Sequence, residues 1–355
     1  MPDGLVIQSH KGPYSVAFLE SLPDERQLLA GQPHFLLDAN VARLYGERLG
    51  AVLTHPHAVV IEATERNKSI EQVIPVIERL VANKVRRDHV LVAIGGGIIQ
   101  DITCFIASTL MRGVMWKFVP TTLLAQADSC IGSKSSINLG ATKNILGTFN
   151  PPNEIFVCTA FLDTIEDKDL HSGIGEILKV HAIEGAAAFD RLAADYEALL
   201  DDRAVLLAYL RAALLIKQRF IEIDEFDKGP RNIFNYGHSF GHAIESATDF
   251  GVPHGIAVTM GMDMANYIAV KRGLLPGAHY HRMHPVLRKN YAKFAGVPIS
   301  LDGMLSALMK DKKNTSAMLC LIFPVGDQAV IQGVDVSLDD IFHAQCAAFF
   351  AETTG

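Results

Sequence analysis

Three histidines in a short stretch of the chain could bind a metal ion. His238 and His242 are four residues apart in a helical pattern, so their side chains would lie on one helical face. His254 follows after a short loop and begins the next helical pattern. Imidazoles in this arrangement could converge on one divalent cation, although each histidine alone is more often structural. The HExxH order is absent, so the stretch is not the common zinc-protease motif.

A carboxylate could complete such a site. A catalytic zinc ion usually has three protein ligands and an open position, so an acid is needed if one histidine does other work. Glu176 is the candidate, because it lies in a helical pattern among the apolar residues Ile174 and Ile177. A buried carboxylate requires a partner. We therefore expect Glu176 either to bind the metal or to lie on a solvent-exposed face.

A run of glycines could bind a phosphate group. The strand-like segment 90–94 leads directly into Gly95, Gly96 and Gly97, and a helical pattern covers 99–111. Glycine lets the backbone approach a pyrophosphate closely, and the N-terminus of a helix supplies N–H donors. The spacing is not GxGxxG, so the run could equally be a tight turn.

Polar residues end two other strand-like segments. Asp38 ends the segment 34–38, where a carboxylate can accept hydrogen bonds from ribose hydroxyls. Thr121 and Thr122 follow the segment 117–119, and adjacent hydroxyls suit a phosphate or ribose. The alternatives are an exposed turn aspartate and helix-capping threonines.

Several cationic residues lie in polar or glycine-rich surroundings. The segments 128–136 and 143–144 are predicted to be loops, and their Gly, Ser and Lys residues suit an anionic ligand. Any one of these cations could instead be an ordinary surface residue. The set comprises Arg112, Lys134, Lys143, Lys179, Lys217 and Arg231.

The composition indicates a soluble globular protein. The chain has 355 residues, of which 49% are hydrophobic, enough for two domains. Its formal net charge of −7 argues against nucleic-acid or membrane-surface binding. The five cysteines include no CxxC pair, which favours buried free thiols in a reducing compartment. The N-terminus lacks a signal-peptide pattern, so we expect a cytoplasmic protein.

The order of the predicted elements indicates two domains. Short β-branched segments alternate with helical patterns in the first half, which is typical of a doubly wound parallel sheet. The second half is mainly helical, with two strand-like segments near its end at 318–323 and 329–332. We predict a Rossmann-like α/β domain at 1–167 and a helical domain at 168–355. Ligands of open α/β sheets bind beyond the strand ends, so we expect a cleft between the domains. The predicted helices are 170–185, 186–201, 203–224, 238–248, 254–272 and 283–295.

Read together, these segments resemble dehydroquinate synthase and its sugar phosphate cyclase relatives. The similarity extends from Asp38 to about Lys313. It is carried by Gly95–Asp101, Met111–Gly113, Val119–Ala125, Asp128–Lys134, Lys143–Asn144, Glu176–Lys179, Arg231–Glu245 and His254–Gly255.

The resemblance implies a fold and a set of site residues. It implies a two-domain enzyme that binds NAD through its first half, a divalent metal such as zinc or cobalt, and a sugar phosphate. The implied NAD contacts are Asp38, Glu65, Lys68, Gly95, Gly96, Gly97, Asp101, Thr121, Thr122, Lys134, Lys143 and Thr164. The implied metal ligands are Glu176, His238 and His254. The implied substrate-pocket residues are Asp128, Lys134, Lys143, Asn144, Lys179, Lys217, Arg231, Asn235 and His242. Arg112 resembles an arginine that reaches the substrate phosphate across a homodimer, and Lys313 resembles a further substrate-facing lysine.

The resemblance also implies a reaction. NAD⁺ oxidises a substrate alcohol, phosphate is eliminated, the hydride returns, and an intramolecular aldol step closes a carbocycle. His242 would relay protons, while Lys134, Lys143 and Arg231 would hold the anionic groups.

The substrate prediction rests on three residues. Arg231, Asn235 and His242 match the dehydroquinate synthase pattern, which implies 3-deoxy-D-arabino-heptulosonate 7-phosphate as substrate and 3-dehydroquinate as product. Departures at Gln100 and Ser133 leave a cyclase for sedoheptulose 7-phosphate, or for another sugar phosphate of secondary metabolism, as the alternative. A metal-dependent polyol dehydrogenase and a non-catalytic binding protein are rivals from other classes. The cationic residues argue against the first, and the three candidate ligands argue against the second.

Overall fold

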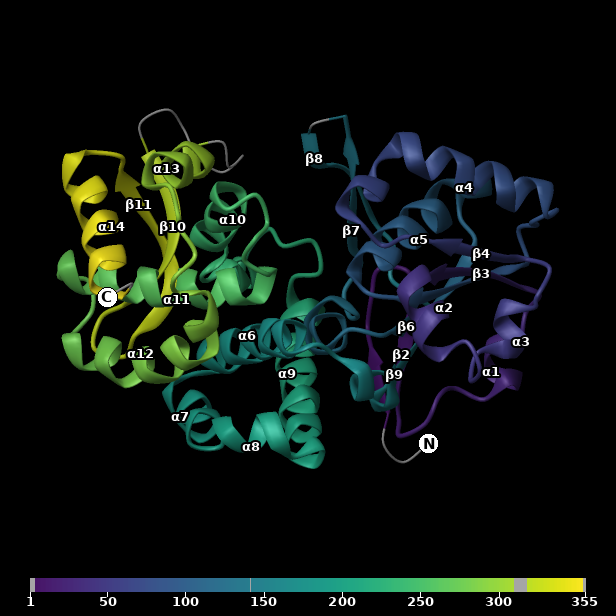
Figure 1. Cartoon of the computed structure of the whole chain (residues 1–355), viewed down its shortest axis with the longest axis horizontal. Helices are drawn as coiled ribbons and strands as arrows, with labels where there is room; N and C mark the ends of the chain where they lie inside the picture. Colours follow the sequence, from purple (N-terminus) through teal and green to yellow (C-terminus); the bar gives the residue numbers. More distant parts are fainter. Residues whose placement is uncertain (1–3, 141, 310–317, 354–355) are drawn as a thin grey trace. The chain divides into compact units, whose positions relative to one another are not determined.

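The computed structural model describes residues 4–140, 142–309 and 318–353. The chain divides into two compact units (Figure 1). Unit 1 comprises Met1–Glu166 and Lys217–Lys228, and unit 2 comprises Asp167–Ile216 and Gly229–Gly355. Among the described residues, no helix is long and apolar enough to cross a membrane.

Unit 1 contains a seven-stranded sheet in the order β1-β2-β9-β6-β5-β3-β4. Every neighbouring pair is parallel except the antiparallel pair β1–β2 at one edge. Every residue of β5 is buried, as expected for a central parallel strand covered on both faces. The predicted α/β fold class is therefore confirmed. The strands are β1 (Leu5–Ile7), β2 (Tyr14–Leu19), β3 (Pro33–Asp38), β4 (Ala58–Ile61), β5 (Val90–Gly95), β6 (Met115–Pro120) and β9 (Glu154–Cys158).

Helices cover this sheet on both faces (Figure 1). Because side chains alternate along a strand, Phe35, Leu37 and Val92 point to one face, where they pack with the first three helices. Helix α5 contacts β5 and β6 from the other face. The helices are α1 (Glu25–Leu29), α2 (Ala39–Tyr45), α3 (Gly50–Leu53), α4 (Ile70–Ala82) and α5 (Gly97–Thr109), with short helical turns η1 (Glu65–Lys68), η2 (Leu110–Arg112), η3 (Ala125–Ser129) and η4 (Thr159–Thr164).

The structure corrects part of the prediction of loops at 128–136 and 143–144, because 130–133 form turns and bends whereas 134–136 and 143–144 lie in strands. Strands β7 (Lys134–Leu139) and β8 (Thr142–Phe149) form an antiparallel hairpin here. The Gly, Ser and Lys content suggested irregular structure, but β7 packs against α5 and α4. Pairing with a neighbouring strand and with these helices overrides the weak local β-propensity.

Unit 2 is mainly helical, as predicted. The predicted helix 186–201 is divided at Asp195 into α7 (Ala186–Ala194) and α8 (Tyr196–Asp201). The late strand-like segments form the antiparallel hairpin β10 (Met318–Val325) and β11 (Val330–Ser337), which contacts α11 through β10. The other helices are α6 (Asp167–Glu184), α9 (Arg203–Ile223), α10 (His238–Ala247), α11 (His254–Lys271), α12 (Gly277–Tyr291), α13 (Leu301–Met309) and α14 (Asp340–Thr353), with the turns η5 (Pro230–Asn235) and η6 (Ala292–Phe294).

The division of the chain differs from the predicted domains 1–167 and 168–355 in one segment. The C-terminal end of α9 and the residues after it group with unit 1. Gln218 donates a side-chain hydrogen bond to the carbonyl of Val6 (3.0 Å). The backbone N–H of His10 donates to Glu225 (2.8 Å). These bonds join segments far apart in the sequence, so periodicity along the chain could not predict them.

Candidate functional site

Unit 2 brings Glu176 of α6 close to two of the candidate histidines. Its Oε1 atom lies 3.4 Å from Nε2 of His254 and 3.7 Å from Nε2 of His238. The side chain is buried, and neither carboxylate oxygen makes a well-directed hydrogen bond with another described residue. Lys179 forms an ion pair with the other oxygen. Burying a carboxylate without hydrogen bonds is costly, so this arrangement indicates a site for a further cation.

The spacing of these donor atoms fits one tetrahedral metal ion. Ligands about 2.1 Å from a zinc ion lie about 3.4 Å from one another. The two distances from Oε1 are close to this value. Carboxylate oxygen and imidazole nitrogen are also the donors that zinc and similar divalent metals accept.

His242 offers an alternative set of ligands. The ring nitrogens of His238, His242 and His254 lie within 4.8 Å of one another, so three imidazoles could also hold an ion. That set would leave Oε1 of the buried Glu176, which faces His238 and His254, beside the metal without binding it. Its burial therefore favours Glu176, His238 and His254, and leaves the exposed His242 next to the site.

The protonation states also suit a metal site. Burial raises the pKa of Glu176, but Lys179 and the histidines lower it well below its usual range, so the carboxylate is charged. Burial and Lys179 hold the pKa of His238 well below its usual value, so its ring is neutral. Burial lowers the pKa of His254, but the Glu176 and Glu245 carboxylates raise it to about 10 overall. A bound cation would displace the proton of His254, because metal and proton compete for the same nitrogen.

A further carboxylate orients His254. Oε2 of Glu245 lies 3.0 Å from Nδ1 of His254, which leaves Nε2 facing Glu176. Such outer carboxylates fix the ring orientation of metal-binding histidines and raise their basicity. Glu245 was not among the residues predicted to serve the site. The available signal was its position in α10, three residues after His242 and therefore near the same helical face.

Two glycines allow α6 and α11 to approach closely enough to form this site. A Cβ atom on Gly255 would lie 1.8 Å from the carbonyl oxygen of Ser172, and one on Gly175 would lie 2.1 Å from that of Gly255. Both positions therefore exclude any larger residue. The contact places Glu176, which follows Gly175, beside His254, which precedes Gly255.

Predicted substrate residues lie on neighbouring elements of unit 2. Lys179 is buried on α6, and its nitrogen lies 5.7 Å from the ring centre of Phe234 in η5. Arg231 of η5 is also buried. The side-chain amide of Asn235 donates to the carbonyl of Asn232 (2.9 Å). Because η5 packs against α6, cationic and amide groups lie on the elements around Glu176.

Unit 1 brings together the glycine turn and the polar strand ends. A Cβ atom on Gly95 would lie 3.2 Å from that of Asp38, and one on Gly96 would lie 3.0 Å from the side chain of Thr122. The N–H of Thr121 donates to the carbonyl of Gly95 (3.0 Å). These residues therefore form one cluster at the N-terminus of α5. Asp38 also caps α2 by accepting from the N–H of Asn40 (2.8 Å).

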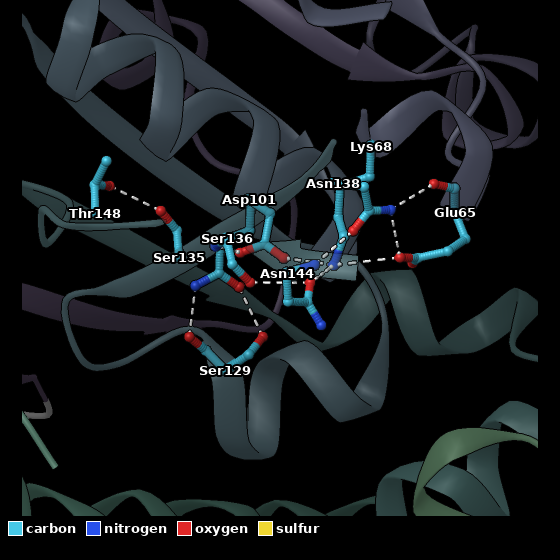
Figure 2. Close-up of polar contacts among 10 residues, drawn as sticks. Glu65, Lys68, Asp101, Ser129, Ser135, Ser136, Asn138, Asn144 and Thr148 are labelled. Atoms are coloured by element: carbon cyan, nitrogen blue, oxygen red, sulfur yellow. Dashed lines mark hydrogen bonds and ion pairs between the residues drawn. The ribbon is translucent and has the colours of Figure 1, made fainter. Parts of the chain in front are cut away.

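A second cluster connects α5 to the β7–β8 hairpin (Figure 2). Nζ of Lys68 lies 3.1 Å from Oδ2 of Asp101 and 2.8 Å from Oδ1 of Asn144. The other oxygen of Asp101 accepts from the N–H of Ser136 (3.1 Å). Glu65 lies 3.7 Å from Lys68 and accepts from the side chain of Asn138 (2.9 Å). Four predicted residues, Glu65, Lys68, Asp101 and Asn144, therefore meet in one network.

Two further ion pairs involve predicted residues of unit 1. Nζ of Lys217 lies 2.7 Å from Oδ1 of Asp128, and Lys217 is buried. Nζ of Lys134 lies 3.1 Å from Oδ2 of Asp227, and the lysine is exposed.

Three further predicted residues are placed as follows. Thr164 is 2.9 Å from the hydroxyl of Tyr45. Lys143 is exposed and lines a pocket together with Glu65 and Asn138, and Arg112 is exposed. Arg112 has a left-handed backbone conformation with φ of 64°. Lys313 lies outside the described residues.

Comparison with known proteins assigns the chain to a family. Its residues 58–172 match the model of the 3-dehydroquinate synthase N-terminal domain, and residues 173–314 match that of the C-terminal domain. The chain is 34% identical over 326 residues to 3-dehydroquinate synthase of Alkaliphilus oremlandii, covering 88% of this chain and 89% of that protein. The chain belongs to the 3-dehydroquinate synthase family. It is 37% identical over 303 residues to the synthase of Rhodospirillum rubrum, covering 81% of this chain and 78% of that protein.

The solved structures agree with this assignment. A 2-epi-5-epi-valiolone synthase from Streptomyces hygroscopicus, solved with NAD⁺ and Zn²⁺, has a TM-score of 0.80 at 28% identity and covers 96% of each chain. An iron-containing alcohol dehydrogenase from Thermotoga maritima shares the fold at 15% identity, with a TM-score of 0.62 over 96% of this chain and 97% of that one. The predicted family is confirmed, and the chain is a dehydroquinate synthase-like sugar phosphate cyclase, an enzyme that acts by phosphate elimination. The polyol dehydrogenase alternative rests on likeness of fold alone.

Proposed function

We propose that the enzyme converts 3-deoxy-D-arabino-heptulosonate 7-phosphate to 3-dehydroquinate and phosphate, using NAD and a divalent metal such as zinc or cobalt. The observation that carries the metal requirement is the buried Glu176 carboxylate, which lacks well-directed hydrogen bonds and faces two imidazole nitrogens. Curated relatives at 34% and 37% identity support the choice of substrate, since both are 3-dehydroquinate synthases.

Glu176, His238 and His254 would hold the metal, and Glu245 would keep the ring of His254 in place. A bound metal polarises a substrate hydroxyl and so makes its oxidation easier. His242 is exposed beside this set, with its ring centre 5.4 Å from that of His238 and 5.5 Å from that of His254. It would accept and return a proton at the substrate oxygen.

The cations that the resemblance assigns to the substrate pocket would bind anionic groups. Lys179 and Arg231 are buried in unit 2, and each could donate charge-assisted hydrogen bonds to a carboxylate or phosphate. Lys134 and Lys217 are each paired with an aspartate in unit 1. A substrate with both a phosphate and a carboxylate uses more of these cations than a neutral polyol would.

The glycine turn and the N-terminus of α5 would bind the pyrophosphate of NAD, and Asp38 would accept hydrogen bonds from a ribose. Bound NAD supplies a reversible hydride acceptor, so the overall conversion involves no net oxidation. The network around Lys68 and Asp101 would hold the hairpin that carries Asn144 against α5. Arg112 would reach the substrate phosphate of a second copy in a homodimer.

A phosphate-release assay with added NAD⁺ and zinc or cobalt tests this proposal. The substrates are the carboxylated heptulosonate phosphate, sedoheptulose 7-phosphate and glucose 6-phosphate. We expect the first to have a kcat/KM at least 100-fold above the others, since charge-assisted hydrogen bonds to its carboxylate contribute about 3 kcal/mol. Preference for sedoheptulose 7-phosphate would instead support the second candidate, a related cyclase like the valiolone synthase that shares 28% identity.

A further inference from the structure

A short π-helical turn in unit 1 ends with two backbone carbonyls that are bound by side chains. The turn η3 spans Ala125–Ser129, and the N–H of Cys130 donates to the carbonyl of Ala125 (2.9 Å). The carbonyl of Asp128 accepts from Nζ of Lys217 (2.5 Å). The next carbonyl, that of Ser129, accepts from Nε2 of Gln100 (2.6 Å). Isolated π-turns lose regular helical bonding and occur frequently at functional sites.

The amide of Gln100 makes a reciprocal pair of bonds with Ser129. Besides donating to the Ser129 carbonyl, it accepts from the Ser129 hydroxyl (2.7 Å). The side chain of Gln100 is buried, so loss of either bond would leave a polar atom without water. Only an amide offers a donor and an acceptor at the same end of a side chain of this length. Figure 2 shows Ser129 next to the network that contains Asp101 and Ser136.

Gln100 also lies in the first turn of α5, directly after the glycine turn. Its N–H donates to the carbonyl of Gly96 (3.0 Å). Contacts therefore connect Gly96 to Gln100 and Gln100 to Ser129. The residue before Ser129 is Asp128, and both the carbonyl and the carboxylate of Asp128 bind Lys217.

We infer that Gln100 is a positioning residue, which holds the Asp128–Lys217 pair in place relative to the glycine turn that would bind the dinucleotide. The inference rests on the proposed function for its catalytic consequence. Catalysis depends on holding reacting groups to within a fraction of an ångström, and a displaced turn lowers kcat even when the ligand still binds. Gln100 itself need not contact substrate or cofactor.

Substitutions of Gln100 and Ser129 test this role. Gln100→Leu keeps the approximate size and removes both bonds, while Ser129→Ala removes only the hydroxyl bond. We expect Gln100→Leu to lower kcat at least tenfold, with less than about a threefold change in the dissociation constant of NAD⁺. Ser129→Ala should have a smaller effect. The double variant should be no slower than Gln100→Leu alone, because both substitutions break the same contact.

A chemical readout separates this inference from the proposed function. Amine acetylation followed by mass spectrometry measures the reactivity of Lys217, whose buried ion pair protects it in the wild-type enzyme. We expect Lys217 to react at least threefold faster in Gln100→Leu, and the measurement needs no turnover. Ser108→Ala is the matched control, because it removes a hydroxyl–carbonyl bond (3.2 Å) elsewhere in α5.

Unchanged Lys217 reactivity and unchanged kcat in Gln100→Leu would overturn the inference. So would effects no larger than those of Ser108→Ala, which would indicate an ordinary contribution to stability. If Gln100→Leu does not fold, Ser129→Ala decides the question through the same two measurements. If the wild-type enzyme releases no phosphate from any of the three sugars while Lys217 responds as expected, the proposed function fails and the positioning role stands.

Discussion

The molecule contains two clusters of histidines, and their surroundings differ. In unit 2, His238, His242 and His254 form the trio described above, with Glu176 and Glu245 in contact. In unit 1, a quartet of His34, His55, His57 and His89 lies at the beginnings of β3, β4 and β5.

In the quartet, His34 stacks on His57 and His89, His55 meets His57 edge-on, and no acid is among the groups that shift the pKa of His34. The rings of His34 and His57 are 4.3 Å apart and nearly parallel, and Nε2 of His34 lies 3.0 Å from Nδ1 of His89. Burial, with His57, His89 and His55, lowers the pKa of His34 to about 4. In the trio, two carboxylates raise the pKa of His254 to about 10 despite burial.

The comparison shows that the number of histidines in a cluster does not define a metal site. Among the described residues, only the trio brings ligand atoms of at least three His, Cys, Asp or Glu residues within 4.8 Å of one another. His34 and His57 stack face to face, so the lone pairs in their two ring planes do not point toward a common ion. The quartet also lies at the amino ends of the strands, whereas ligands of open α/β sheets bind at the carboxyl ends.

The largest expected effect is at Glu176. Glu176→Gln should lose most of the bound metal and lower kcat/KM by at least 1,000-fold, because a neutral amide neither balances the cation nor binds it well. Metal analysis after dialysis and the phosphate-release assay measure both. His34→Phe in the quartet is the comparison and should retain metal and activity. If Glu176→Gln and His34→Phe lost equal amounts of metal, the trio would not be the metal site.

The proposed roles within the trio differ. His238 and His254 would bind the metal, and His242 would carry protons. His242→Ala should lower kcat by about 100- to 10,000-fold while the metal content stays near that of the wild-type enzyme. The same two assays apply, with His238→Ala as the matched variant that should lose metal. Metal loss in His242→Ala would instead support the set of three imidazoles.

A substitution of Glu245 tests whether the carboxylates beside the trio contribute to metal binding. Glu245→Gln keeps the shape of the side chain but weakens its hold on Nδ1 of His254. Metal affinity should fall by about 10- to 100-fold, as expected for an outer carboxylate. Titration with a competing chelator measures this, and full activity should return at saturating metal. Unchanged affinity would mean that Glu245 does not orient the ligand.

The smallest effect concerns the stability of the quartet in acid. The pKa of His34 falls from 6.5 to about 4 on folding, so unfolding takes up a proton between these values. The neutral ring of His34 therefore contributes fully to the free energy of unfolding above pH 6.5. This contribution is lost as the pH falls toward 4. The loss amounts to at most about 3 kcal/mol.

Melting temperatures between pH 4 and 7 measure this effect. His34→Phe keeps a ring in the stack but cannot be protonated, so its melting temperature should fall less steeply with acid than that of the wild type. His281→Phe, at an exposed position, is the control. If the melting temperatures of all three proteins fall equally with pH, protonation of His34 does not affect stability.

Local patterns predicted much of the fold. The apolar run of β5 and the helical patterns at α5 and α11 indicated elements close to those observed, because burial of a repeating face dominates their formation. The β7–β8 hairpin was wrongly predicted as loops, since its polar residues are held by α5 and by each other. The segment 217–228 was assigned with unit 2 because its bonds to unit 1 are distant in sequence.

The sequence by itself determined the residue types available for chemistry: paired histidines on one helical face, a glycine turn after a strand, and cations in an acidic chain. The resemblance of its motifs named the family and selected Glu176, His238 and His254 as the set of ligands. The packing of the helices then showed that this carboxylate meets both histidines, that Glu245 contacts His254, and that Gln100 bonds to Ser129. The physical reason is that such contacts depend on how closely helices pack. The glycine contact between α6 and α11 sets that distance, and no pattern within either helix specifies it.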